Sequence, residues 1–382
     1  MPRPATMTTV PGVVAADTGD GEGPTGTPAG IDAARVTAWF EAQVPEVAPP
    51  LSFEVIAGGH SNLTYRVDDS AGRRWVLRRP PLGQVLATAH DMGREHSVIS
   101  ALAPTDVPVP PVVGLCDDIA VNGAPFYVME FVDGAVLRNR GDAEHLNPDV
   151  LRRCGDDIAD VLTRIHAVDP VAVGLGNLGR KEAYIERQLR RWYGQWEQSK
   201  TRDLPVVDET HAELAAQVPP QVRVAVVHGD YRLDNCLIGP DGSIRAVLDW
   251  ELCTLGDPLA DVGLLLVYWS EASDELPALG DAATVLEGFP SRSQLLQRYR
   301  EVADHALAAA LDNINYYVAF GYWKLACILE GVYARYQAGA MGAPASDSVA
   351  SESNLFARQV EYLADAARAT LRHNAEDRRG TV

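Results

Sequence analysis

The sequence predicts an α+β fold of two lobes, in which an antiparallel β-sheet precedes a larger, mainly helical part. Between residues 53 and 131, short runs rich in β-branched and aromatic residues alternate with turn signals, and one helical pattern interrupts them. From residue 147 onward, apolar residues recur chiefly at helical spacing. A group of short strands and polar loops within residues 224–263 interrupts these helices and carries most of the side chains that suggest chemistry.

Composition limits the class of protein. The chain has 382 residues, which is long enough for two lobes with their own cores. Its formal net charge of −19 argues against binding to nucleic acid or to anionic membranes. No apolar run is long enough to span a bilayer, and the N-terminus lacks the pattern of a signal peptide. The five cysteines are scattered without a C-x-x-C pair, which fits a reducing, cytoplasmic location.

The first lobe is expected to follow a disordered leader. Residues 1–30 are rich in Gly, Pro, Thr and Ala and contain few large apolar side chains. Residues 31–42 have helical spacing, with Asp32 near the start. A further helix is expected at 91–103. Five strands are expected at 53–57, 63–67, 75–79, 112–116 and 124–131.

The second lobe is expected to be a set of amphipathic helices. Its helices are predicted at 147–166, 184–198, 257–266, 295–307, 313–336 and 353–373. We place the nucleotide-binding lobe at residues 31–132 and the helical catalytic and substrate lobe at 133–375, with a tail at 376–382.

Three polar side chains are expected to meet at one edge of the short strands in the second lobe. A strand at 224–227 ends in the tripeptide HGD, and Asn235 follows Asp230 by five positions. The apolar runs 236–238 and 244–248 flank the turn signal GPDG, so they predict a hairpin, and Asp249 comes directly after it. Asp and Asn often only cap turns, and this would be the preferred interpretation of an isolated Asp and Asn at this spacing. The strand–turn–strand context here favours the functional interpretation instead.

Two carboxylates and an amide oxygen suit Mg²⁺, which binds through a few hard oxygen ligands together with waters and phosphate oxygens. A carboxylate in the loop that is not needed for the metal can instead accept a proton from a hydroxyl group. The order of a catalytic-loop Asp, an Asn five positions later and a metal-binding Asp on the next hairpin is the arrangement of kinase phosphoryl transfer.

The motifs HGDYRLDN, LDWE and GDPLADVG resemble those of the aminoglycoside phosphotransferase family of kinase-like enzymes. More narrowly, they resemble the branch that is also found fused to acyl-CoA dehydrogenases. The resemblance covers roughly residues 56–336 and implies a protein-kinase-like fold. It implies that Asp230 positions or deprotonates the acceptor and that Asn235 and Asp249 hold Mg²⁺. His228 and Asp261 match residues that support the catalytic loop.

The same resemblance assigns a nucleotide site to the first lobe. The loop GGHSN, with Ser61 and Asn62, is expected to cover the phosphates, although it is not the G-x-G-x-x-G loop of protein kinases. In the wider family the third strand carries a lysine, and here Arg78 stands in the matching place. Arg79 is the competing candidate, but strand alternation points it to the opposite face. Glu95 matches the family glutamate that pairs with the basic residue.

The segment YVMEFVDG resembles the hinge between kinase lobes. The resemblance implies that adenine bonds the backbone of Glu130 and Val132, while Met129 lines the back of the purine pocket.

We therefore expect a small-molecule kinase that uses Mg²⁺ and transfers the γ-phosphoryl group of ATP to a hydroxyl. The resemblance implies a hydroxyacyl or acyl-CoA-like acceptor in the narrower branch and an aminoglycoside-like alcohol in the wider family. A nucleotide-binding pseudokinase that acts as an interaction module is the alternative, because Arg78 departs from the family lysine. The acceptor, the choice between ATP and GTP, and the oligomeric state remain open from sequence.

Overall fold

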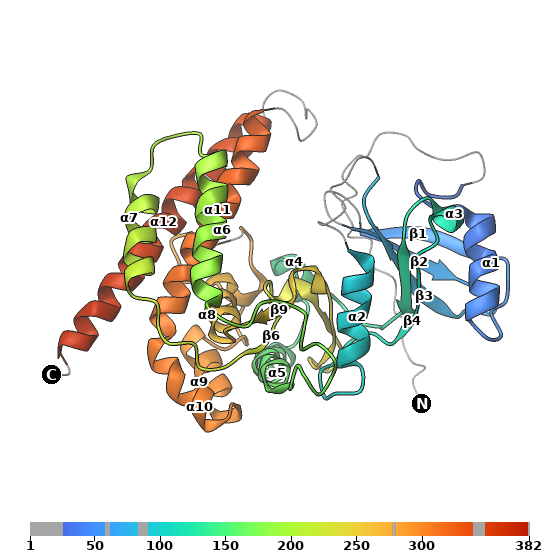
Figure 1. The fold of residues 1–382 in the computed structure, drawn as a ribbon, viewed down its shortest axis with the longest axis horizontal. Helices are drawn as coiled ribbons and strands as arrows, with labels where there is room; N and C mark the ends of the chain where they lie inside the picture. Colours follow the sequence, from blue (N-terminus) through green and yellow to red (C-terminus); the bar gives the residue numbers. More distant parts are fainter. Residues whose placement is uncertain are drawn as a thin grey trace.

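The computed structural model describes residues 26–57, 62–82, 91–276, 278, 280–338 and 348–380. Figure 1 shows a sheet with helices α1, α2 and α3 in one part of the molecule and the remaining helices gathered in the other. This is the two-lobed kinase-like fold that the sequence predicts.

The predicted five-stranded sheet is confirmed, and its neighbouring strands are antiparallel in the order β1-β2-β3-β5-β4. The strands are β1 (Ser52–Ala57), β2 (Leu63–Asp68), β3 (Arg74–Arg79), β4 (Val112–Cys116) and β5 (Phe126–Glu130). Because adjacent residues in a strand point to opposite faces, each face of this sheet has its own partners.

One face of the sheet packs against α1 (Ala33–Gln43), where Val36 and Phe40 join Tyr65, Leu77 and Val128 in a closed apolar cluster. The Asp32 side chain caps this helix by accepting a hydrogen bond from the backbone N–H of Arg35.

The opposite face turns toward α2 (Met92–Leu102) and the helical lobe. Val76 pairs with Met129 and Arg78 pairs with Tyr127 in the register of β3 and β5. Val76, Met129 and Tyr127 belong to the same large apolar core as Val98 of α2. The sheet alternation therefore directs Arg78, and not Arg79, toward the helical lobe.

The helical lobe contains two further pairs of short strands. β6 (Ala225–Val227) pairs with β9 (Thr254–Gly256), and β7 (Cys236–Ile238) pairs with β8 (Ile244–Val247). The predicted hairpin at 236–248 is therefore present, and its second strand ends one residue earlier than expected.

The short helix α3 (Ile119–Asn122) lies with α1 beside the five-stranded sheet (Figure 1). The helices of the other lobe are α4 (Arg140–Ala143), α5 (Pro148–Ala167), α6 (Tyr184–Ser199), α7 (Pro205–Ala216), α8 (Leu259–Tyr268), α9 (Arg292–Val302), α10 (His305–Ala310), α11 (Ile314–Gln337) and α12 (Ser348–Gly380). Short 3-10 turns lie at Leu233–Asn235, Trp250–Leu252, Ala283–Val285 and Leu311–Asn313.

Some predicted boundaries differ from the structure. The helix expected at 295–307 is two helices, because Ala303 leaves helical geometry and the Asp304 side chain caps α10. Residues 376–380 continue α12. Most of the predicted leader, residues 1–25, lies outside the described residues, whereas Ala29 packs on the sheet because its carbonyl accepts a 2.7 Å hydrogen bond from the Tyr65 hydroxyl.

Among the described helices, none combines the length and the apolar character that a membrane crossing would require.

Candidate active site

The backbone of the HGD tripeptide is held by a carboxylate from the following helix. Asp261, near the start of α8, accepts hydrogen bonds from the N–H groups of His228 at 2.7 Å and Gly229 at 2.9 Å. Gly229 has a φ of +88°, and a Cβ at this position would lie 3.0 Å from the Leu252 carbonyl oxygen, so glycine is required here. The predicted contact of Asp261 with the loop is therefore present.

Several groups stabilise the ionised form of Asp261. Burial alone would raise its pKa, but the nearby His166 and His228 and the backbone N–H of Gly229 lower the pKa overall. His166 Nε2 lies 3.5 Å from Asp261 Oδ2, and its other ring nitrogen hydrogen-bonds the Tyr299 hydroxyl at 2.7 Å. The carboxylate thus remains charged inside the protein.

Replacement of Asp261 by asparagine is expected to lower the free energy of unfolding by about 2–4 kcal/mol, because it removes a buried charge that two N–H groups share. Since the folded pKa lies below the ordinary value, the wild-type advantage should be present at neutral pH and should shrink as the pH falls below about 4. Urea denaturation at two pH values measures this. Asp312→Asn, in an exposed ion pair with Arg300, is the matched control and should cost less than about 1 kcal/mol. Equal losses from the two substitutions would contradict the assignment.

His228 connects the loop to the end of the hairpin. Its Nε2 donates to the Leu248 carbonyl at 3.0 Å, so Nδ1 is the acceptor for the Asp230 N–H at 3.3 Å. The ring is buried. The imidazole therefore bridges the two segments that carry Asp230 and Asp249.

Both carboxylate oxygens of Asp230 accept hydrogen bonds. The Tyr268 hydroxyl, from the end of α8, donates to Oδ1 at 2.8 Å, and Asn235 Nδ2 donates to Oδ2 at 3.1 Å. Asn235 Nδ2 also donates to the backbone carbonyl of Asp230 at 2.8 Å. Because the amide nitrogen is used in this way, the Asn235 side-chain oxygen is the group left to face a cation.

Asp249 lies next to Asn235. The Leu248 N–H donates to the Asn235 carbonyl at 2.8 Å, which brings the end of β8 onto this turn. Asp249 has φ +65° and ψ +60°, a left-handed conformation that costs free energy in a residue other than glycine. Such strain is concentrated at functional sites. The predicted metal ligands are therefore adjacent.

Arg78 joins the sheet lobe to this group. Its Nη2 lies 3.0 Å from Asp249 Oδ1 and 3.3 Å from Glu95 Oε1. The Glu95 side chain is only 1% exposed and that of Arg78 11%. The contact with Glu95 was predicted, whereas the contact with Asp249 was not.

Charge complementarity keeps Arg78 protonated. Burial would lower its pKa, but Glu95, Tyr127 and Asp249 raise the pKa above its ordinary value. Burial also raises the pKa of Glu95, and Arg78 opposes that rise. A buried guanidinium between two carboxylates is thus a fixed positive charge at the junction of the lobes.

Arg79 points away from this group, as strand alternation predicts. Its Nη1 donates to the backbone carbonyls of Gly30 and Asn122, the latter at 3.1 Å. Burial lowers its pKa. Arg79 therefore holds the end of β3, the middle strand of the sheet, to the segment before α1 and to α3.

The glycine-containing loop is described only at its end. Ser61 lies outside the described residues, so its predicted role is untested. The Asn62 side chain is buried and its Nδ2 donates to Glu251 Oε2 at 3.3 Å. Burial, followed by the charges of Asp249 and Glu95, raises the pKa of Glu251 to about 7. Asn62 thus contacts the LDWE motif across the two lobes.

The hinge follows β5 directly. Met129 is buried on the sheet face that turns toward α2, and Glu130 is exposed. The backbone N–H of Glu130 donates to the Pro111 carbonyl at 2.8 Å, and the backbone N–H of Phe131 donates to the Arg74 carbonyl at 3.2 Å. These two donors are therefore occupied by the sheet.

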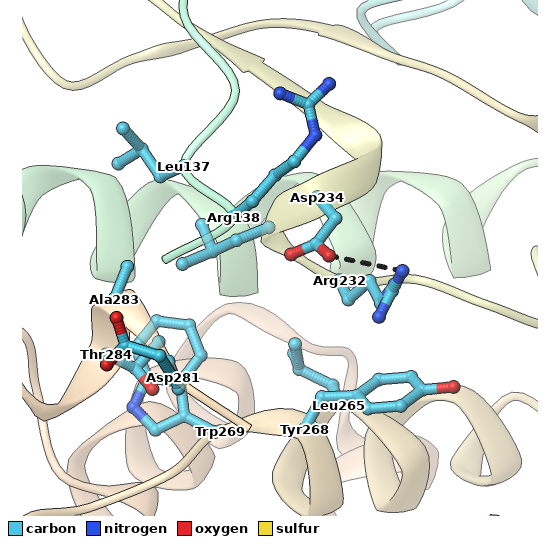
Figure 2. A pocket seen from close by; sticks show the side chains of 12 residues that line it. Leu137, Arg138, Arg232, Asp234, Leu265, Tyr268, Trp269, Asp281, Ala283 and Thr284 are labelled. Atoms are coloured by element: carbon cyan, nitrogen blue, oxygen red, sulfur yellow. Dashed lines mark ion pairs between the residues drawn. The ribbon is translucent and has the colours of Figure 1, made fainter. Parts of the chain in front are cut away.

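A small cavity of about 50 Å³ lies beside the catalytic loop (Figure 2). Arg232 and Asp234, which form a 3.1 Å ion pair, line it from the loop, and Tyr268 and Trp269 line it from the end of α8. Its remaining lining residues are Leu137, Arg138, Leu233, Leu265, Asp281, Ala282, Ala283 and Thr284. The cavity has both apolar walls and charged groups.

Four residues of the site were not singled out from the sequence. Arg232 and Glu251 lie within the recognised motifs, which is the signal that could have found them. Tyr268 and Lys324 lie in helices, where nothing in the pattern marks them. Lys324 of α11 is buried and its Nζ donates to the Gly229 carbonyl at 3.1 Å, and burial lowers its pKa despite the charges of Asp230 and Asp261.

Comparison with known proteins agrees with this geometry. The family model described as the APH phosphotransferase enzyme family matches residues 52–302. The chain is 36% identical to acyl-CoA dehydrogenase family member 10 of Mus musculus over 309 residues, which cover 80% of this chain and 28% of the relative. The chain thus spans little more than a quarter of the length of that relative.

Solved structures share the fold. A crystal structure from Ralstonia eutropha, described as a putative aminoglycoside phosphotransferase, is 31% identical, has a TM-score of 0.71, and the match covers 88% of this chain and 98% of that one. Amicoumacin kinase in complex with AMP-PNP, Ca²⁺ and Ami is 19% identical with a TM-score of 0.54, covering 87% and 94%; this similarity concerns the fold alone.

Proposed function

We propose that this chain, which belongs to the APH phosphotransferase enzyme family, transfers the γ-phosphoryl group of ATP to a hydroxyl of a small molecule. That it is a phosphotransferase acting on hydroxyl groups follows from the family. The observation that carries the proposal is the meeting of Asp230, Asn235 and Asp249 with the Arg78–Glu95 pair. The pseudokinase alternative is not supported, and the sequence keeps the two aspartates and the asparagine that transfer would need.

Each residue has a proposed task. Asp230 accepts a hydrogen bond from the acceptor hydroxyl and receives its proton as the oxygen attacks phosphorus. Arg78, oriented by Glu95, contacts the phosphates of the nucleotide. Asn62 and Ser61 cover the phosphates from the sheet lobe. His228 and Asp261 hold the loop that carries Asp230.

The donor set fits Mg²⁺. The Asn235 side-chain oxygen and the Asp249 carboxylate are hard ligands on two segments that a backbone hydrogen bond joins, and Mg²⁺ uses one or two carboxylates together with phosphates and waters. When bound, the ion would neutralise negative charge on the phosphates. Asn235 and Asp249 would hold it, and Arg78 adds a fixed positive charge next to Asp249.

The hinge is the proposed adenine site. Because the N–H groups of Glu130 and Phe131 bond the sheet, the Glu130 carbonyl and the Val132 N–H are the groups that we expect to contact the base. Met129 would line the back of this pocket.

For the acceptor we propose a hydroxyacyl or acyl-CoA-like compound in preference to an aminoglycoside-like alcohol. The 36% identity to an acyl-CoA dehydrogenase family member supports this class. We place the protein in the cytoplasm.

Release of ADP in the presence of a panel of hydroxy compounds, with and without Mg²⁺, tests the proposal. The panel includes hydroxyacyl thioesters, aminoglycosides and simple amino alcohols. Formation of ADP that needs both Mg²⁺ and one class of alcohol supports the proposal and identifies the acceptor. Nucleotide binding without transfer to any member would favour the pseudokinase alternative.

Replacement of Arg78 by alanine is expected to raise the KM for ATP and lower kcat together. The total loss in kcat/KM should be about 2–4 kcal/mol, as for truncation of one partner in a buried charge pair. Arg78→Lys should retain part of the activity, because the charge remains while the forked geometry is lost. Steady-state kinetics with varied ATP measures this.

Arg79→Ala is the control on the same strand, since the hydrogen bonds that the structure describes for the Arg79 side chain go to the Gly30, Asn122 and Pro80 carbonyls and not to the proposed site. It should reduce stability and leave kcat/KM nearly unchanged in the folded protein. If Arg78→Ala kept its activity while Arg79→Ala lost it, the basic residue at the phosphates would be Arg79 instead of Arg78.

A further inference from the structure

We propose that Tyr268 is a positioning residue for Asp230, an inference that rests on the proposed function. The Tyr268 hydroxyl fixes the orientation of the Asp230 carboxylate toward the acceptor. None of the motifs in the sequence contains Tyr268, and neither the nucleotide nor the proposed metal needs it.

One helix holds both the backbone and the side chain of the catalytic loop. Asp261 and Tyr268 are seven residues apart in α8, so they lie on the same face of the helix, two turns apart. Asp261 accepts hydrogen bonds from the backbone N–H groups of the two residues before Asp230, and the Tyr268 hydroxyl donates one to the Asp230 carboxylate at 2.8 Å. Because α8 is almost entirely buried, it is a rigid reference for both contacts.

The hydrogen bond from Tyr268 is one of two that orient the Asp230 carboxylate. Tyr268 bonds Oδ1 while Asn235 bonds Oδ2, and together they fix the rotation of the carboxylate about its Cβ–Cγ bond. Arg232 Nε lies 3.7 Å from Oδ2. Without Tyr268, the bond to Asn235 and the contact with Arg232 would both act on Oδ2, and nothing would restrain Oδ1 among the described residues.

Tyr268 is suited to be a permanent donor. Burial, with the charge of Asp230, raises the pKa of Tyr268 well above its ordinary value, so the phenol stays protonated. The Arg232 guanidinium lies over its ring, 5.2 Å from the centroid. The Tyr268 hydroxyl is therefore a neutral hydrogen-bond donor to the Asp230 carboxylate. The Tyr268 ring also supports the Arg232 guanidinium, a cation that lies near the same carboxylate.

A second phenol–carboxylate pair provides a matched control. The Tyr317 hydroxyl of α11 donates to Asp257 Oδ2 at 2.7 Å, and Asp257 caps the start of α8 through the Leu259 N–H. This pair has the same chemistry as Tyr268–Asp230 but is more deeply buried, and Asp257 does not belong to the proposed site.

Tyr268→Phe is expected to lower kcat roughly 10- to 100-fold, the effect of removing one hydrogen bond to a charged group that reacts. The KM values for ATP and acceptor should stay within about twofold, because neither substrate is expected to contact the hydroxyl. Tyr317→Phe should reduce the melting temperature and leave kcat near the wild-type value. An unchanged kcat in Tyr268→Phe, or equal kcat losses in the two variants, would overturn the inference.

A crystal structure of Tyr268→Phe provides a readout that does not depend on activity. We expect the Asp230 carboxylate to rotate from its position in the wild-type crystal or to occupy more than one orientation. A carboxylate with unchanged position and order would overturn the inference. Absence of phosphoryl transfer by the wild-type protein would instead refute the proposed function, and the orientation of Asp230 in the variant would still decide the role of Tyr268.

Discussion

Replacement of Asp230 by asparagine is expected to reduce phosphoryl transfer roughly 10²- to 10⁴-fold, the range for loss of a general base. Asparagine preserves the size of the side chain, its one oxygen can accept from Tyr268, and the Asn235 amide keeps its bond to the backbone carbonyl of residue 230, so the loop should keep its shape. Affinity for the Mg²⁺ complex of a non-hydrolysable ATP analogue should change by less than about threefold, because Asp230 is placed at the acceptor and not on the nucleotide. Steady-state kinetics and calorimetric titration measure the two quantities.

The control for this substitution is Asp241→Asn in the turn of the neighbouring hairpin. Asp241 is half-exposed, and the side chains that it bonds in the described part of the chain are those of Ser243 and Arg245 nearby, so its replacement should leave kcat unaffected. If Asp230→Asn weakens nucleotide binding as much as it slows transfer, Asp230 binds the metal–nucleotide complex, and its proposed role at the acceptor is wrong.

Asp249→Ala should be the second most damaging substitution, with a loss of roughly 10²- to 10³-fold in kcat/KM, as for removal of one preorganised group from a charged transition state. It removes a charge as well as an oxygen ligand, and it also removes one of the two partners of Arg78. Asn235→Ala removes a neutral ligand and should cost less. Kinetics across a Mg²⁺ titration measure both variants.

The Mg²⁺ dependence separates a metal ligand from a purely structural residue. Asp249→Ala should require more Mg²⁺ for half-maximal activity, whereas a structural substitution such as Asp261→Asn should alter stability first. Wild-type activity of Asp249→Ala at saturating Mg²⁺ would contradict its assignment as a ligand.

Much of the site could be predicted because its residues are close in sequence or lie on regular elements. The short spacings within HGDYRLDN and the hairpin place Asp230, Asn235 and Asp249 together through local structure alone. Strand alternation correctly directs Arg78 and Arg79 to opposite faces. The five strands of the sheet could be predicted for the same reason, because residue composition and turn signals are local properties of the sequence.

What the sequence missed depends on packing between distant segments. Tyr268 reaches Asp230 across 38 positions and Lys324 reaches Gly229 across 95, and helical periodicity carries no information about such partners. The contact of Arg78 with Asp249 spans 171 positions and depends on how the lobes meet. The division of the helix expected at 295–307 was missed because the Asp304 cap lies within an otherwise continuous helical pattern.

The central claim is that Asp230 directs an ATP-derived phosphoryl group onto a hydroxyl. Incubation with ATP labelled in the γ-phosphoryl group and the panel of hydroxy compounds, followed by mass spectrometry of the products, tests it most directly. The wild-type protein should yield a phosphate ester of one acceptor class with equal ADP, only when Mg²⁺ is present, and Asp230→Asn should yield almost none while still binding nucleotide. Equal product from wild type and Asp230→Asn would contradict the account.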